Sequence, residues 1–389
     1  MSLEPLLLRH RVVACVGSGG VGKTTTAAAL ALHAALSGRE VLCLTIDPAR
    51  RLAQSLGIDG RAGVEHRVPD EAFARHGLRP RGVLWAMMLD PKRAFDELVT
   101  RRASSPQARE RILGNRIYRH LSESLAGVQE YMAMEKLHEV RERGRWDLVV
   151  LDTPPTSNAI DFLEAPDKLI GLIDSPATRW LVQAFESERR RFSLDLLGRG
   201  AAYLLRGLSR FTGLEFLSNV AEFVVGLNEL FGGFRAHAEQ VARALRGPEV
   251  AFVLVTSPAP LAIDEALYMH ERLVSASMRP AAFVVNGVHR LLPEPAVPHE
   301  ALLEAARAFF APPTDVEDLV GRLRRALDDE RALAIADRVE VERLRARAAG
   351  ALPVVEVPAF DADVHDLGAL AAVAEHLIQR PTHAVVATA

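Results

Sequence analysis

An α/β fold with a doubly wound, mostly parallel sheet is predicted by three features of this 389-residue sequence. Short, almost continuously apolar runs recur along the chain, which is typical of strands that are buried on both faces. Stretches of helical length and composition separate these runs. Polar residues stand at the ends of several runs, where sheets of this kind bind their ligands.

The first strand is expected at residues 12–16 (VVACV), before a glycine-rich loop and a helix over residues 25–36. Further strands are expected at residues 41–46, 148–151, 250–256, 281–285 and 354–357. The carboxyl ends of parallel strands meet at one edge of the sheet. The polar residues expected at that edge are Ser18, Asp47, Asp152, Thr256 and Asn286.

Two helical stretches interrupt this alternation, at about residues 95–140 and 167–245, and we interpret them as insertions that form a subdomain beside the sheet. The whole chain, residues 1–389, is then one domain, with a peripheral helix over residues 315–347 and a surface loop at 293–298. Within the second insertion, apolar residues between Phe216 and Phe231 cover a wide helix face. That face is either ordinary core or an interaction surface.

Composition argues against several classes of partner. The formal net charge is -3, so no nucleic acid or anionic membrane is expected to bind by bulk electrostatics. Both cysteines, Cys15 and Cys43, fall inside expected strands and are interpreted as packing residues, which suits a reducing cytoplasm. Charges interrupt every long apolar run, and no transmembrane segment is expected.

The loop in CVGSGGVGKTTT, residues 15–26, has the sequence of a phosphate-binding loop. It stands between an expected strand and an expected helix, as that motif requires. Its glycines let backbone N–H groups turn toward a phosphate, Lys23 adds a positive charge, and Thr24 offers a hydroxyl to Mg²⁺. The sequence therefore predicts that ATP or ADP is bound with Mg²⁺ by Gly17, Ser18, Gly19, Gly20, Val21, Gly22, Lys23, Thr24 and Thr25.

Two acids at strand ends complete this prediction. Asp152 is expected to hold Mg²⁺ through water, and Asp47 to act on the attacking water, so that Lys23, Asp47 and Asp152 are the catalytic candidates. An aspartate at a strand end is more often a helix N-cap. The phosphate-binding loop on a neighbouring strand favours the nucleotide role here.

Together these segments resemble the ATPase family of the arsenite-pump subunit ArsA and the tail-anchored-protein targeting factors. GSGGVGKTT is similar to the family's deviant phosphate-binding loop, TIDPARRL to its first switch, and LDTPPTSNAIDFLEAP to its second. The resemblance implies a P-loop nucleoside-triphosphatase fold, a catalytic role for Asp47, and an adenine pocket that contains Asn286 and Pro358.

The departures from the family pattern are specific. Ser18 stands where the family carries a lysine that reaches the partner's phosphates across a dimer. Ser157 and Asn158 replace a glycine-histidine pair, and neither the zinc-binding CxxC nor the paired arsenite-binding cysteines are present. The missing lysine implies slow hydrolysis, or a heterodimer with a lysine-bearing paralogue, unless Arg50 or Arg51 substitutes. Both arginines are equally consistent with solvated helix residues.

Three functions are consistent with these residues. We expect a cytoplasmic, dimeric ATPase that couples hydrolysis to rearrangement of its helical subdomain around a protein partner, a hydrophobic client or a membrane-protein client. The alternatives are a weakly hydrolysing regulatory subunit of a hetero-complex, which Ser18 favours, and an anion-pump subunit, which the missing thiolate cluster disfavours.

Overall fold

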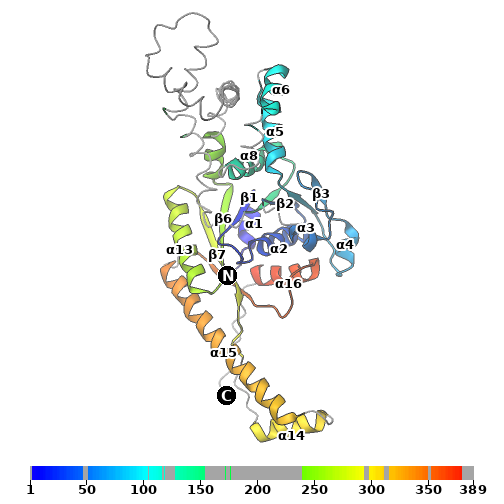
Figure 1. Cartoon of the computed structure of the whole chain (residues 1–389), viewed down its shortest axis with the longest axis vertical. Coiled ribbons are helices and arrows are strands. Elements are labelled where there is room, and N and C mark those ends of the chain that lie inside the picture. Colours follow the sequence, from blue (N-terminus) through cyan, green and yellow to red (C-terminus); the bar gives the residue numbers. More distant parts are fainter. Residues whose placement is uncertain are drawn as a thin grey trace, which may run out of the picture.

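The computed structural model describes residues 2–46, 51–103, 105–115, 118, 128–153, 171, 176, 239–292, 298–310, 315–348 and 352–378. In this part of the chain one eight-stranded sheet carries helices on both faces (Figure 1). The strands are β1 (Val12–Val16), β2 (Glu40–Thr45), β3 (Glu65–Arg67), β4 (Val83–Met88), β5 (Leu148–Asp152), β6 (Val250–Thr256), β7 (Pro280–Val288) and β8 (Val354–Pro358). The helices are α1 (Glu4–Arg9), α2 (Lys23–Leu36), α3 (Arg51–Leu56), α4 (Asp70–Ala74), α5 (Pro91–Arg102), α6 (Pro106–Gly114), α8 (Val128–Arg143), α13 (Pro260–Ser275), α14 (His299–Phe309), α15 (Val316–Arg347) and α16 (Leu367–Ile378).

The strands follow the order β3-β4-β2-β5-β1-β6-β7-β8. Every neighbouring pair is parallel except β3 and β4, so the prediction of a doubly wound, mostly parallel sheet is confirmed. The connection after β1 leads to one side of that strand and β6 lies on its other side. The carboxyl end of β1 therefore stands where the strand order reverses, the place at which such sheets bind ligands.

Alternate residues of β1 enter two separate cores. Val12, Ala14 and Val16 pack in the core with α5, α8 and α13, while Val13 and Cys15 pack in the core with α2 and α16. Successive side chains of a strand point to opposite faces, so a strand covered on both sides needs apolar residues at every position. This explains the uninterrupted run VVACV, which is buried throughout.

Two strands were not predicted from the sequence, β3 and β4. The three residues of β3 are polar and partly exposed, and strand β3 pairs antiparallel with β4 at the edge of the sheet. A polar edge strand such as β3 carries little of the apolar signal that identifies an inner parallel strand. Strand β4 is different, because it lies between β3 and β2 and its sequence VLWAMM is apolar at every position, so its apolar run was present in the sequence and was overlooked.

The first predicted insertion, residues 95–140, contains α6 and most of α5 and α8. Phe95, Leu98, Tyr131 and Leu137 from α5 and α8 are buried in the same core as β1 and β2. The second insertion, residues 167–245, lies almost wholly outside the described residues, and so does the apolar face between Phe216 and Phe231.

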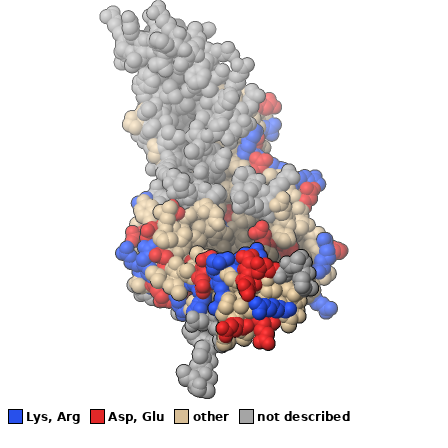
Figure 2. Space-filling view, turned by 60° about the horizontal axis from the view of Figure 1, so that its bottom comes forward, with Lys and Arg blue, Asp and Glu red and all other residues tan. Residues whose placement is uncertain are grey.

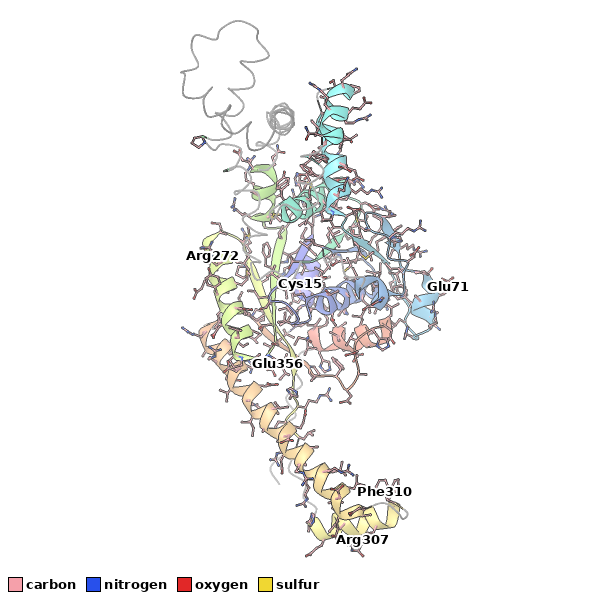
Figure 3. The ribbon with its side chains drawn as sticks, in the orientation of Figure 1. Cys15, Glu71, Arg272, Arg307, Phe310 and Glu356 are labelled. Atoms are coloured by element: carbon pink, nitrogen blue, oxygen red, sulfur yellow. The ribbon has the colours of Figure 1, made fainter. Side chains whose placement is uncertain are left out.

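The long helix α15 runs away from the sheet and carries α14 at its far end, where Arg307 and Phe310 lie (Figures 1 and 3). Among the described residues on the face seen in Figure 2, basic and acidic side chains are interspersed, with no extended block of one charge. Among the described helices, none is long and apolar enough to cross a membrane.

Candidate functional site

The loop between β1 and α2 has the backbone of a phosphate cradle. Gly22 is the N-cap of α2 with φ 92° and ψ 26°, so the helix begins at Lys23 with no acidic side chain in its first turn. The first N–H groups of a helix have no partner within the helix and point toward its N-terminal end, where they can bind an anion. The positive end of this 14-residue helix is therefore directed at the loop.

Two glycines of the loop are required by close approach as well as by backbone conformation. Gly17 has φ 153°, and a Cβ added there would lie 2.0 Å from the carbonyl oxygen of Val255. Gly22 has φ 92°, and a Cβ there would lie 2.2 Å from Nδ2 of Asn286. Because L side chains rarely adopt such φ values, no other residue fits either position without displacing a neighbour.

Lys23 folds back over the loop. Its side chain is buried, and Nζ donates a hydrogen bond to the carbonyl oxygen of Ser18 at 2.5 Å. This contact places the positive charge of Lys23 against the loop. It is made to the backbone of residue 18, so it does not require a serine side chain there. Ser18 itself is half-buried, while Gly19 and Gly20 are exposed.

The carboxylate of Asp152 gathers hydroxyls from two other elements. Its Oδ2 accepts hydrogen bonds from Oγ1 of Thr24 at 2.7 Å and from Oγ1 of Thr45 at 2.8 Å. Asp152 is fully buried at the end of β5, where strand register places it beside Thr45 on β2 and Cys15 on β1. Burying a carboxylate is costly unless hydrogen bonds satisfy it, so the two threonines stabilise the charge in this position.

These oxygens fit a magnesium ion. Mg²⁺ prefers oxygen ligands, is bound by one or two protein groups, and takes its other ligands from phosphate and water. Thr24 and Asp152 supply a hydroxyl and a carboxylate in direct contact beside the loop. Among the described residues there is no group of three or more His, Cys, Asp or Glu side chains that could hold a metal ion. A magnesium ion at Thr24 and Asp152 would therefore take its remaining ligands from phosphate and water.

Both cysteines are buried free thiols of the sheet. Burial raises the pKa of the Cys15 thiol far above its usual range, the Asp152 carboxylate raises it further, and Lys23 opposes this in part. Burial, with Asp152 and Cys15 beside it, likewise raises the pKa of Cys43 well above 9.0. Figure 3 shows Cys15 in the interior of the fold. Two protonated and buried thiols do not form a thiolate site for a soft metal or metalloid.

The two residues predicted for the adenine pocket lie on neighbouring strands. Asn286 is near the end of β7 and Pro358 is the last residue of β8, and the register pairs Asn286 with Val357 and Val288 with Pro358. Both are half-buried. Nδ2 of Asn286 donates a hydrogen bond to the carbonyl oxygen of Val21, 3.1 Å away, so this side chain also contacts the phosphate-binding loop.

The remaining predicted residues are divided between described and undescribed parts of the chain. Thr25 is half-buried in the first turn of α2. Asp47 and Arg50 lie outside the described residues, as do the side chain of Arg51 and the residues 157 and 158. Ile46, which precedes Asp47, donates its N–H to the carbonyl oxygen of Asp152 at 3.1 Å.

Sequence reasoning missed Thr45. Its hydroxyl shares Oδ2 of Asp152 with Thr24, yet it is 107 residues away from that aspartate in the sequence. The available signal was a hydroxyl residue near the end of an apolar run, one strand away from the acid. Thr256 ends β6 in the same way, but its hydroxyl donates to the carbonyl oxygen of Ser257 instead.

Comparison with known proteins adds two findings. Residues 10–181 match the family model described as anion-transporting ATPase. The protein named ATPase GET3 from Kluyveromyces lactis is 24% identical over 292 residues, which cover 71% of this chain and 72% of that relative. The protein of the same name from Podospora anserina is 26% identical over 283 residues, covering 72% and 73%. The match to ATPase GET3 of Malassezia globosa, 29% identical over 157 residues, covers 40% of this chain and 42% of that relative, which is less than half its length.

Proposed function

We propose that this protein binds ATP with Mg²⁺ and hydrolyses it, on the premise that its residues 10–181 match the family model described as anion-transporting ATPase. The single observation that carries the proposal is the hydrogen bond between Thr24 and Asp152 beside a glycine loop at a helix N-terminus. These are the side chains that hold the metal in P-loop enzymes. A glycine turn of purely structural use has no need of a buried carboxylate there.

Each side chain has a defined part in the proposed reaction. The N–H groups at the start of α2 and the ammonium of Lys23 bind the β and γ phosphates, and they stabilise the negative charge that moves between them. Thr24 and Asp152 would hold Mg²⁺, Asp152 through water. When bound, Mg²⁺ would supply positive charge that compensates the phosphates. Asp47, the residue after Ile46 in the sequence, would orient the attacking water.

The use of this hydrolysis is proposed from the family resemblance of the sequence. We propose a cytoplasmic protein that forms a homodimer, or a heterodimer with a lysine-bearing paralogue. Its helical segments would rearrange around a protein partner or a hydrophobic client. The relatives from Kluyveromyces lactis and Podospora anserina are named ATPase GET3, and that name supports the ATPase activity alone.

A weakly hydrolysing regulatory subunit is the second candidate, and Ser18 favours it. A loop with serine at this position retains Lys23 and the backbone cradle, since the ammonium of Lys23 contacts the backbone carbonyl of residue 18 and not its side chain. It lacks a cation for another subunit. An anion-pump subunit with a thiolate site is disfavoured, because Cys15 and Cys43 are buried and protonated.

Calorimetric titration with ADP and Mg²⁺ tests nucleotide binding directly. Lys23→Ala removes the loop's cation and is expected to weaken binding by about 100-fold, the scale of a lost charged hydrogen bond or two. The matched control is Lys92→Ala, since Lys92 lies on α5 in an ion pair with Asp96. Equal affinity of wild type and Lys23→Ala would remove the P-loop assignment.

A further inference from the structure

Asn286 reaches the phosphate-binding loop from a strand that is not adjacent to β1. In the sheet order β6 lies between β1 and β7. Val284 packs in the core that contains α2, and Asn286, two residues later, lies on the same face of the strand. Beyond it, Gly287 has φ 78° and the pairing with β8 shifts register between Asn286 and Val288. The regular part of β7 thus ends with this side chain turned toward the start of α2.

Two contacts join this side chain to the loop. Nδ2 donates to the carbonyl oxygen of Val21 at 3.1 Å. The same nitrogen lies so close to Gly22 that a Cβ at that residue would be 2.2 Å from it. The amide of Asn286 therefore both holds and packs against the peptide that links Val21 to Gly22, directly before Lys23.

Holding this peptide sets the direction of a phosphate-binding group. In a trans peptide the C=O and the N–H point in opposite directions. When Asn286 fixes the carbonyl of Val21, it also fixes the N–H of Gly22, which points in the opposite direction within the same peptide plane. N–H groups at this position of a glycine loop bind the phosphates.

We propose that Asn286 is a positioning residue for the phosphate-binding loop, and that its effect falls on phosphate affinity and not only on recognition of the base. This inference rests on the proposed function. It differs from the adenine-pocket role, in which Asn286 and Pro358 would contact the base alone. The two roles are separated by a ligand that has phosphates and no base.

Inorganic tripolyphosphate with Mg²⁺ is such a ligand. Titrations compare tripolyphosphate and ATP on wild type, Asn286→Ala and the control Pro358→Ala. Asn286→Ala is expected to weaken tripolyphosphate binding by about tenfold, the effect of one hydrogen bond. Pro358→Ala is expected to change tripolyphosphate affinity less than about twofold.

The outcomes distinguish this inference from the proposed function. If Asn286→Ala weakens ATP but leaves tripolyphosphate unchanged, Asn286 is a base contact and the inference is wrong. If wild type binds neither ligand, the proposed function fails, and the inference with it. A loss of tripolyphosphate affinity in Asn286→Ala, in a ligand-free variant that its urea unfolding curve shows to be fully folded under the titration conditions, supports the positioning role.

A double-mutant cycle tests the contact without any ligand. Gly22→Ala places a methyl group 2.2 Å from Nδ2 of Asn286, whereas in the Asn286→Ala background the nearest atom of residue 286 is its Cβ at 3.8 Å. Gly20→Ala is the control, because Gly20 also has positive φ (79°) but nothing lies within 4 Å of the added Cβ. Both substitutions carry the same kind of backbone strain.

Urea unfolding of these variants gives the result. Gly22→Ala is expected to lower the midpoint more than Gly20→Ala, and the excess is expected to disappear when residue 286 is alanine. If the effect of Gly22→Ala is the same in both backgrounds, Asn286 does not press on the loop and the inference is wrong.

Discussion

Thr24 at the start of α2 donates a hydrogen bond of 2.7 Å to Asp152 at the end of β5, 128 residues further along the chain. The same carboxylate oxygen accepts from Thr45 at the end of β2. One buried charge thus connects the phosphate-binding loop with two strand ends. Of the residues that meet here, Thr45 is expected to support stability, whereas Asp152 is expected to support the binding of Mg²⁺ and nucleotide.

Thr45→Val is expected to lower the free energy of unfolding by about 1.5–3 kcal/mol, because a buried carboxylate loses one of its donors without a change in shape. Thr45 is 1% exposed, so water cannot replace the lost hydroxyl readily. Chemical denaturation measures the loss. Thr153→Val is the control, since Thr153 is equally buried and donates to a neutral carbonyl, that of Cys15. It should cost about 0.5–1.5 kcal/mol, and an equal cost for both variants would contradict the role given to the Asp152 charge.

Asp152→Asn should impair Mg²⁺-dependent nucleotide binding and hydrolysis together, because the carboxylate holds the metal in the ground state as well as in the transition state. Titration with ADP in the presence and absence of Mg²⁺ measures this. In wild type the metal should raise affinity, and in the variant that gain should be lost. A variant that keeps the full effect of Mg²⁺ would show that Asp152 only stabilises the sheet edge.

Asp47→Asn should leave ATP affinity nearly unchanged and reduce turnover by about 100-fold or more, the range of a lost general base. Orienting the attacking water matters in the transition state and not in the bound ground state. Steady-state rates and ATP titration on one preparation separate the two effects. Wild-type turnover in this variant would assign the water to another residue.

Ser18→Lys should raise ATP turnover and promote compaction of an ATP-bound dimer. The added ammonium would neutralise part of the negative charge of the phosphates that face each other across the dimer. In P-loop enzymes, a cation supplied by another subunit raises the hydrolysis rate by about 10³–10⁵. Steady-state rates and small-angle scattering provide the readouts. The matched control Ser18→Gln has a long side chain without the charge. No gain over this control would mean that the serine is compensated locally, with Arg50 or Arg51 as the candidates, or that the dimer does not close in this way.

The raised pKa values of the two buried thiols lead us to expect that stability depends on pH. Both cysteines have pKa values raised above 9.0 in the folded protein, so their protonated form is favoured there and the unfolded chain loses protons first. Their contribution is therefore present below pH 9 and is lost as pH rises above that value. Chemical denaturation at pH 8 and pH 9.5 should show a lower free energy of unfolding at the higher pH for wild type, and a smaller decrease for the double variant Cys15→Ala, Cys43→Ala.

Arsenite should not stimulate ATPase activity, because both thiols are buried and have raised pKa values, so neither is an available thiolate ligand.

The sequence by itself determined the inner part of the fold. A strand that is covered on both faces needs apolar residues along its length. Residues 12–16 and 250–256 show this as continuous, almost wholly apolar runs that can be recognised in the sequence alone. The phosphate-binding loop was equally readable, because glycine spacing, Lys23 and Thr24 are all local. Asp152 was identified for the same reason, as an acid directly after an apolar run.

Only the tertiary structure decided which of these groups meet. Thr45 faces Asp152 because of the register between β2 and β5, and Asn286 reaches Val21 across an intervening strand. Register and strand order arise from how both cores pack, and no local spacing in the sequence encodes either of them. The edge strand β3 was missed on similar grounds, since its three polar residues form a strand only where β4 offers them a partner.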